Sequence, residues 1–166
     1  MSSTPSPKPQ LGFKAFLKIA KTRHYKTRVP TKVEKRAHID IILSGLTPQK
    51  KVSIISVDLK ACKSIKKCSN KWHWIELRDP HGKPGWLYQE ADFIVFERKH
   101  DFILVNRQNL VNWVNTLNKI RFDLPFVQQS WEAKYRLYRR PGKNESITQI
   151  QFEDFCQIND THIWEK

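Results

Sequence analysis

Two acids and a lysine in a predicted β-hairpin have the types and spacing that metal-assisted chemistry requires. Asp40 lies in a first apolar run, residues 38–43, and Asp58 and Lys60 end a second run, residues 52–60. Because side chains alternate along a strand, Asp58 and Lys60 point to the same side. If the strands fold back about the middle of the turn, Asp40 lies opposite Asp58, with Cβ atoms about 5 Å apart. Two carboxylates at that separation repel unless something positive lies between them.

A divalent metal ion would resolve this repulsion. Mg²⁺ prefers oxygen ligands, often one or two carboxylates together with water and substrate phosphate. The ion polarises the phosphate and helps to make a nucleophile from water. A lysine alongside orients that water or stabilises charge on the phosphoryl oxygens. We therefore expect a phosphodiester-hydrolysing site that uses Mg²⁺, with Mn²⁺ as the alternative ion.

The hairpin is predicted from the composition of the two runs and from the turn-forming residues between them. Runs rich in isoleucine and valine flank a turn segment that contains Gly45 and Pro48. An acid followed by D-x-K is a short pattern, and chance matches to such patterns are common. The alternative interpretation is a solvent-facing hairpin end that carries an ordinary Asp–Lys pair.

Asp40 followed by Asp58-Leu59-Lys60 at a strand end resembles the core motif of the PD-(D/E)xK nuclease superfamily, the fold of many restriction endonucleases and repair nucleases. The resemblance covers roughly residues 11–106. It implies a restriction-endonuclease-like fold in which Asp40 and Asp58 bind the metal. It also implies the backbone carbonyl of Leu59 as a further ligand and Lys60 as the catalytic lysine.

The sequence departs from the family pattern at two places. Ile39 stands where the namesake proline would be, a position that varies widely in the superfamily. The helix predicted for residues 11–23 contains no acid, although this helix often supplies a glutamate. Glu34 is therefore the early candidate ligand, but we favour an ion pair between Glu34 and Lys35 or Arg36.

A further acid follows the motif in the next predicted strand. Residues 71–77, K-W-H-W-I-E-L, alternate in polarity, which places Trp72, Trp74 and Glu76 on one face. Glu76 could act as a further catalytic acid. It could equally be an edge charge paired with Arg78 or a nearby lysine.

Positive charge is concentrated in the first part of the chain. The 166 residues carry a formal net charge of +14, which indicates a polyanionic partner. Residues 1–72 contain 17 Lys and Arg but 3 acids, whereas the remainder contains 13 of each. Two of those three acids are Asp40 and Asp58. Such a distribution suits a groove in which basic residues bind phosphate and the few acids hold a metal.

We therefore predict a metal-dependent endonuclease acting on nucleic acid, with DNA favoured by the family resemblance. A homodimer would supply the two active sites that cutting both strands commonly needs. The alternatives are a non-catalytic basic nucleic-acid-binding protein and an interaction module with an acidic partner. The candidate phosphate-binding residues are Lys26, Arg28, Lys32, Arg36, Lys63, Lys66 and Lys67.

The cysteines favour a reducing, intracellular compartment, cytoplasm or nucleus (nucleoid), because Cys62, Cys68 and Cys156 form an odd set without a dense framework. A zinc site built from Cys62, Cys68, His73 and His81 is a minor alternative, because the spacing matches none of the familiar zinc patterns. The sequence contains no apolar stretch near 20 residues, so we expect no membrane span. Residues 1–10 contain no apolar h-region, so we expect no signal peptide. Motifs of P-loop motors, zinc proteases and serine hydrolases are absent.

The remaining pattern predicts an α/β (α+β) fold, in which a mixed central β-sheet is flanked by helices. We expect residues 1–10 to be a disordered tail and residues 11–166 to form a single domain. Asp92 and Glu97 flank an apolar run and are expected to be surface charges. The other predicted elements are a loop at 24–35, strands beginning at 85 and spanning 91–97, 101–106 and 147–152, a helix at 108–118, and an aromatic stripe with helical spacing at 129–140.

Overall fold

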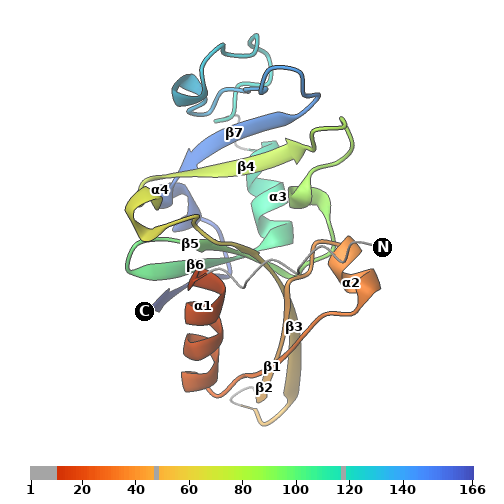
Figure 1. Ribbon diagram of the computed structural model, residues 1–166, viewed down its shortest axis with the longest axis vertical. Coiled ribbons are helices and arrows are strands. Elements are labelled where there is room, and N and C mark those ends of the chain that lie inside the picture. Colours follow the sequence, from red (N-terminus) through yellow and green to blue (C-terminus); the bar gives the residue numbers. More distant parts are fainter. Residues whose placement is uncertain (1–10, 47–48, 117–118) are drawn as a thin grey trace, which may run out of the picture.

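A six-stranded mixed sheet organises the computed structural model, which describes residues 11–46, 49–116 and 119–166 (Figure 1). The strand order is β1-β2-β3-β5-β6-β8, and β4 and β7 form a separate two-stranded ribbon. The predicted disordered tail lies outside the described residues. The elements are α1 (Leu11–Thr22), β1 (Lys26–Arg28), α2 (Lys32–Arg36), β2 (Ile41–Leu46), β3 (Val52–Lys60), η1 (Ile65–Lys67), β4 (Trp72–Arg78), η2 (Trp86–Tyr88), β5 (Phe93–Glu97), β6 (Asp101–Asn106), α3 (Arg107–Thr116), η3 (Ser130–Glu132), β7 (Ser146–Gln151), α4 (Phe152–Phe155) and β8 (Thr161–Glu165).

The predicted hairpin is confirmed as the antiparallel pair β2–β3, with Ile41 opposite Val57 and Gly45 opposite Ser53. Gly45 therefore belongs to β2 and not to the turn. A Cβ at this position would lie 2.9 Å from the ring of Tyr25, so the glycine lets that ring approach the strand. The other predicted turn residue, Pro48, lies outside the described residues.

Strand β3 joins the hairpin to the rest of the sheet. It pairs in parallel with β5, which places Asp58 beside Ile94 and Lys60 beside Phe96. Parallel strands require a crossover connection, and here it contains β4 and η2. Strand β4 does not join this sheet, because it pairs with β7.

Helix α1 covers one face of the sheet. Its apolar residues recur at helical spacing, and Phe16, Ile19 and Ala20 are buried. They pack against alternate residues of the sheet, including Val57 and Leu59 of β3. Since neighbouring side chains in a strand point to opposite faces, Asp58 and Lys60 face away from α1.

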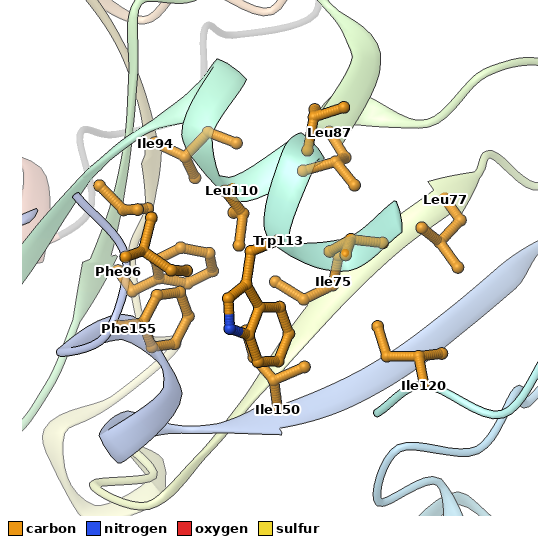
Figure 2. Packing of buried hydrophobic residues seen from close by; sticks show 14 of the residues in the cluster. Ile75, Leu77, Leu87, Ile94, Phe96, Leu110, Trp113, Ile120, Ile150 and Phe155 are labelled. Carbon is orange, nitrogen blue, oxygen red and sulfur yellow. The ribbon is translucent and has the colours of Figure 1, made fainter. Parts of the chain in front are cut away.

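The opposite face carries the larger core (Figure 2). Ile94 and Phe96 from the sheet meet Trp113 of α3 and Ile75 of β4 there. Figure 1 shows the β4–β7 ribbon at the top, with α3 between it and strands β5 and β6, and α1 below these two strands. The two packed faces confirm the predicted mixed sheet with flanking helices.

Local pattern predicted several connecting segments incorrectly. Residues 24–35 are not a loop throughout, because they contain β1 and the start of α2, where Thr31 and Glu34 form a capping box. Residues 85–88 form the 3₁₀ turn η2 and not a strand, and the backbone N–H of Tyr88 donates to the Gly85 carbonyl. The short strand β8 was not predicted.

The aromatic residues at 129–140 do not line a helix. Apart from the single turn η3, this stretch makes irregular bridges to neighbouring backbone. Its aromatic side chains pack individually on the ribbon, with the Tyr135 ring centre 5.3 Å from that of Trp72. Tertiary contacts with β4 and β7 therefore replace the helical hydrogen bonds that the spacing predicts.

We predict that Phe16→Ala lowers the free energy of unfolding by about 3–5 kcal/mol, because it removes a fully buried ring. The ring packs against Phe102 and Trp164 at centroid distances of 5.3 and 5.5 Å. Urea denaturation measures the change. Phe122→Ala is the control, since that ring is 50% exposed, and equal losses in the two variants would contradict the assigned core.

Candidate active site

The hairpin brings the two predicted metal-binding acids close to each other, and the Asp40 carboxylate acts electrostatically on Asp58. Asp40 directly precedes β2, and its backbone N–H donates to the Val57 carbonyl at 2.8 Å. The paired register of the hairpin ends at Ile41 and Val57, and Asp40 and Asp58 adjoin this last pair. The Leu59 backbone N–H donates to Asp40 Oδ2 at 2.8 Å, which fixes the Asp40 carboxylate against β3.

The two acids differ in their environments. Asp40 is exposed, whereas Asp58 is 3% exposed. Burial raises the pKa of Asp58 to about 6, although nearby Lys60 lowers it, and repulsion from the Asp40 carboxylate raises it further. The folded protein therefore holds the Asp58 proton more tightly than the unfolded chain does.

Asp58 differs from the other buried acids in how its oxygens are satisfied. Within the described residues, the buried acids are Asp58, Glu97, Glu145 and Asp154. Both oxygens of the other three accept hydrogen bonds, from partners such as Lys166, Arg140 and Lys119. Asp58 Oδ1 contacts Lys60 Nζ at 2.8 Å, but Oδ2 has no hydrogen-bond partner in this part of the chain. A buried, unpartnered carboxylate oxygen is a good position for a metal ligand.

Lys60 connects the acids to an aromatic wall. Its side chain is 26% exposed, and its Nζ lies 2.8 Å from Asp58 Oδ1 and 4.4 Å from the ring centre of Trp86. The ion pair and the cation–π contact hold the ammonium group at the end of β3. The predicted catalytic lysine therefore lies beside the acid pair and still reaches solvent.

Glu76 does not join this pair. Its Oε1 accepts from the Trp86 backbone N–H at 3.1 Å, so the side chain fastens η2 to β4. A Cβ at Gly85 would lie 2.4 Å from the Glu76 carbonyl oxygen, so glycine permits this close approach. Glu76 thus positions Trp86, a residue that sequence reasoning assigned to a strand and missed as part of the site.

Glu34 is an ion-pair partner, as favoured from the sequence, but neither Lys35 nor Arg36 is the partner. Its carboxylate accepts two hydrogen bonds from Arg28, at 2.8 and 3.0 Å, and one from the Thr31 backbone N–H. These bonds hold the pKa of Glu34 at about 2. Since these bonds use both oxygens, Glu34 stabilises the start of α2 instead of binding a metal.

The predicted phosphate-binding residues are all exposed. They flank the acid pair in sequence, with one group on β1 and α2 just before Asp40 and the other after Lys60, in and beside η1. The first group is Lys26, Arg28, Lys32 and Arg36, and the second is Lys63, Lys66 and Lys67. Arg28 is engaged with Glu34, so the remaining six are the stronger candidates for phosphate contacts.

Two clefts are each lined by a residue of the candidate site. One, of about 430 Å³, is lined by Asp40 together with residues of α1, β1 and α2. The other, of about 300 Å³, is lined by Lys60 and by side chains of β4, η1 and η2. We name the second the tryptophan cleft, because Trp72, Trp74 and Trp86 line it.

The loop after β3 is closed by a disulfide between Cys62 and Cys68, which the sequence did not predict. Disulfides persist mainly in oxidising compartments, so the cysteines do not support the predicted intracellular location. The alternative zinc site is not assembled either. Of the described residues, the potential ligands brought together are the two disulfide cysteines and Glu97.

Glu97 was expected at the surface but is buried. Its oxygens accept from the Cys62 backbone N–H at 2.7 Å and from Lys166 Nζ at 2.8 Å. These partners neutralise the buried carboxylate, so it serves to anchor the loop after Lys60. Asp92 is exposed as predicted, and accepts from the backbone and hydroxyl of Ser56.

Among the described residues, none of the helices has the length and apolar character needed to cross a membrane. Comparisons of the chain with protein-family models, with curated proteins and with solved structures find no match.

We predict that Asp58→Asn stabilises the metal-free protein at about pH 8 by up to about 3 kcal/mol, measured by urea denaturation. The folded pKa of about 6 lies above the ordinary 3.8, so the folded state binds this proton more tightly. Wild-type stability therefore falls as pH rises from about 4 to about 6, and the asparagine removes this loss.

The stability difference between Asp58→Asn and the wild type should therefore shrink as pH falls from about 6 to about 4. The exposed Asp123 pairs with Arg121, and its pKa is lowered to about 2. Asp123→Asn is the control and should show no gain at high pH. A pH-independent gain from Asp58→Asn would contradict the burial of this charge.

Proposed function

We propose that the protein is a metal-dependent endonuclease with a restriction-endonuclease-like core that hydrolyses phosphodiester bonds, most readily in DNA. The single observation that carries the proposal is the buried Asp58 carboxylate, with one oxygen on Lys60 and the other without a partner in the described chain. Asp40 supplies a second carboxylate at the same point of the hairpin.

The donor set fits Mg²⁺ or Mn²⁺. Asp58 Oδ2 and the exposed Asp40 carboxylate would hold the ion, with the Leu59 carbonyl as the further ligand that the family resemblance implies. Oxygen donors without soft ligands suit these ions. A bound ion would supply Lewis acidity at the scissile phosphate and assist deprotonation of the attacking water.

Lys60 would stabilise the phosphate as negative charge develops. Its ammonium group is held by Asp58 and Trp86 but remains partly exposed. A preorganised cation at this place acts on the phosphoryl oxygens without moving. The lysine can also orient the water that attacks the phosphorus atom.

The topology is consistent with the proposed core. An antiparallel hairpin carries the acids, its second strand pairs in parallel with β5, and helices lie on both faces. The exposed basic residues on both sides of the site would bind the nucleic-acid backbone. A homodimer would place two such sites on the two strands of a duplex.

We predict that the purified protein nicks or linearises plasmid DNA with Mg²⁺ or Mn²⁺ and that a chelator stops the reaction. Asp58→Ala and Lys60→Ala should each reduce the rate by about 100-fold or more, because the first removes a proposed metal ligand and the second a cation that stabilises the reacting phosphate. Agarose gels measure the cleavage.

Glu165→Ala and Lys143→Ala are the controls, since both residues are exposed and lie outside the proposed site. They should cleave at the wild-type rate. Cleavage that persists in Asp58→Ala and Lys60→Ala would show that the activity belongs to another site or to a contaminant.

The second candidate is a non-catalytic basic protein on a degenerate nuclease fold. It is favoured by the position of Glu76, which fastens η2 and leaves the acid pair without a third acid among the described residues. Such a protein would bind nucleic acid in a chelator and at low salt but would not cleave it.

Both candidate functions require the basic residues to contact the phosphate backbone of the nucleic acid. We predict that Lys66→Ala lowers affinity for DNA and reduces the slope of log affinity against log salt by about 1, because one phosphate contact is lost. Fluorescence anisotropy across a salt series measures the slope. The same change from the exposed Lys143→Ala would show that binding is not localised near η1.

A further inference from the structure

We propose that the tryptophan cleft binds one unpaired nucleobase next to the scissile phosphate, so that the substrate carries a single-stranded, flapped or looped nucleotide there. This inference rests on the proposed nuclease function, since it identifies the class of nucleic acid that the site would accept. It is carried by the composition of the cleft, by its charge and by its connection to Lys60.

The cleft has aromatic walls that are open to solvent. Trp72 and Trp86 are half-buried, and Trp74 is 38% exposed on the outer face of β4. Trp72 and Trp74 rest on Tyr135 and Tyr138, with centroid distances of 5.3 and 6.2 Å. Each of these two tryptophan rings thus packs on a tyrosine and keeps accessible surface, which suits stacking against a flat ring.

Positive charge surrounds the aromatic walls. Lys60 and Lys67 line the cleft, and Lys134 Nζ lies 5.3 Å from the ring centre of Trp72. The acid that lines it, Glu97, is already neutralised by Lys166 and the Cys62 backbone N–H. Aromatic platforms combined with cations are the features that bind single-stranded nucleic acid without sequence preference.

Lys60 connects this cleft to the proposed chemistry. The same ammonium group contacts Asp58 and the Trp86 ring, so a phosphate at the acid pair and a base on the tryptophans would belong to neighbouring parts of one strand. In a paired duplex the bases are stacked inside the helix and cannot reach such a cleft unless they are flipped out. Single-stranded and damaged or unpaired positions lower that cost.

The test compares binding of fluorescein-labelled oligonucleotides by anisotropy in chelator: a single strand, a blunt duplex, and that duplex with a single-stranded flap. Wild type should prefer the single strand and the flap. Trp74→Ala should weaken binding to those two by about 5- to 100-fold, with little effect on the blunt duplex, because one stacking contact is lost. Trp74→Phe should restore most of the affinity.

Trp131→Ala is the matched control, since this tryptophan is 68% exposed in η3 and does not line the cleft. Far-ultraviolet circular dichroism and thermal melting establish that each variant is folded. Equal affinity of the wild type for all three probes would overturn the inference. Equal loss from Trp74→Ala and Trp131→Ala would also overturn it.

The same probes with Mg²⁺ separate this inference from the proposed function. If Asp58→Ala abolishes cleavage but keeps the Trp74-dependent preference for unpaired probes, both claims stand. If wild type cleaves none of the probes but keeps that preference, the nuclease function fails and the base-binding cleft stands. If it cleaves the blunt duplex as fast as the flap and Trp74→Ala changes neither rate, the nuclease stands and the base-binding cleft fails.

Discussion

The negative charge of Asp58, buried at the end of β3, is the constraint around which the rest of the site is arranged. Placing a carboxylate away from water is costly unless a cation or hydrogen bonds compensate it. Lys60 compensates one oxygen, and Trp86 in turn holds the lysine. Trp86 depends on η2, which Glu76 fastens to β4. The crossover from β3 to β5 therefore serves the site, because it brings an aromatic wall to the lysine of the hairpin.

The buried acids differ in whether both of their carboxylate oxygens have hydrogen-bond partners. Glu97, Glu145 and Asp154 each have both oxygens bonded; Glu97 and Asp154 join distant segments, and Glu145 closes a local turn with Arg140. Glu97, for example, anchors the loop after Lys60 to the end of the chain. Asp58 keeps one oxygen without a partner in the described chain. Folding alone would favour a neutral side chain there, so the ligand role that we propose for Asp58 comes at some cost to stability.

In the proposed function, the basic residues and the aromatic residues bind different parts of the nucleic acid. Lysines and arginines on β1, α2 and η1 flank the acids and suit the repeating phosphates of a nucleic acid. The tryptophans of β4 and η2 offer flat, partly exposed rings, which suit a base and not a phosphate. Lys60 lies where the two surfaces meet.

Local spacing was sufficient to predict α1, the β2–β3 hairpin and the approach of Asp40 to Asp58, because alternation and turn position follow from neighbouring residues. It was not sufficient for Glu76, Trp86 or Glu97. Glu76 and Trp86 meet across the turn at residues 79–85, where Gly85 permits a close approach and a 3₁₀ turn replaces the predicted strand. Glu97 is buried because Lys166 and the Cys62 backbone reach it from distant positions. Such non-local contacts leave no periodic signal in the sequence, so only the folded structure reveals which acids are buried and bonded on both oxygens.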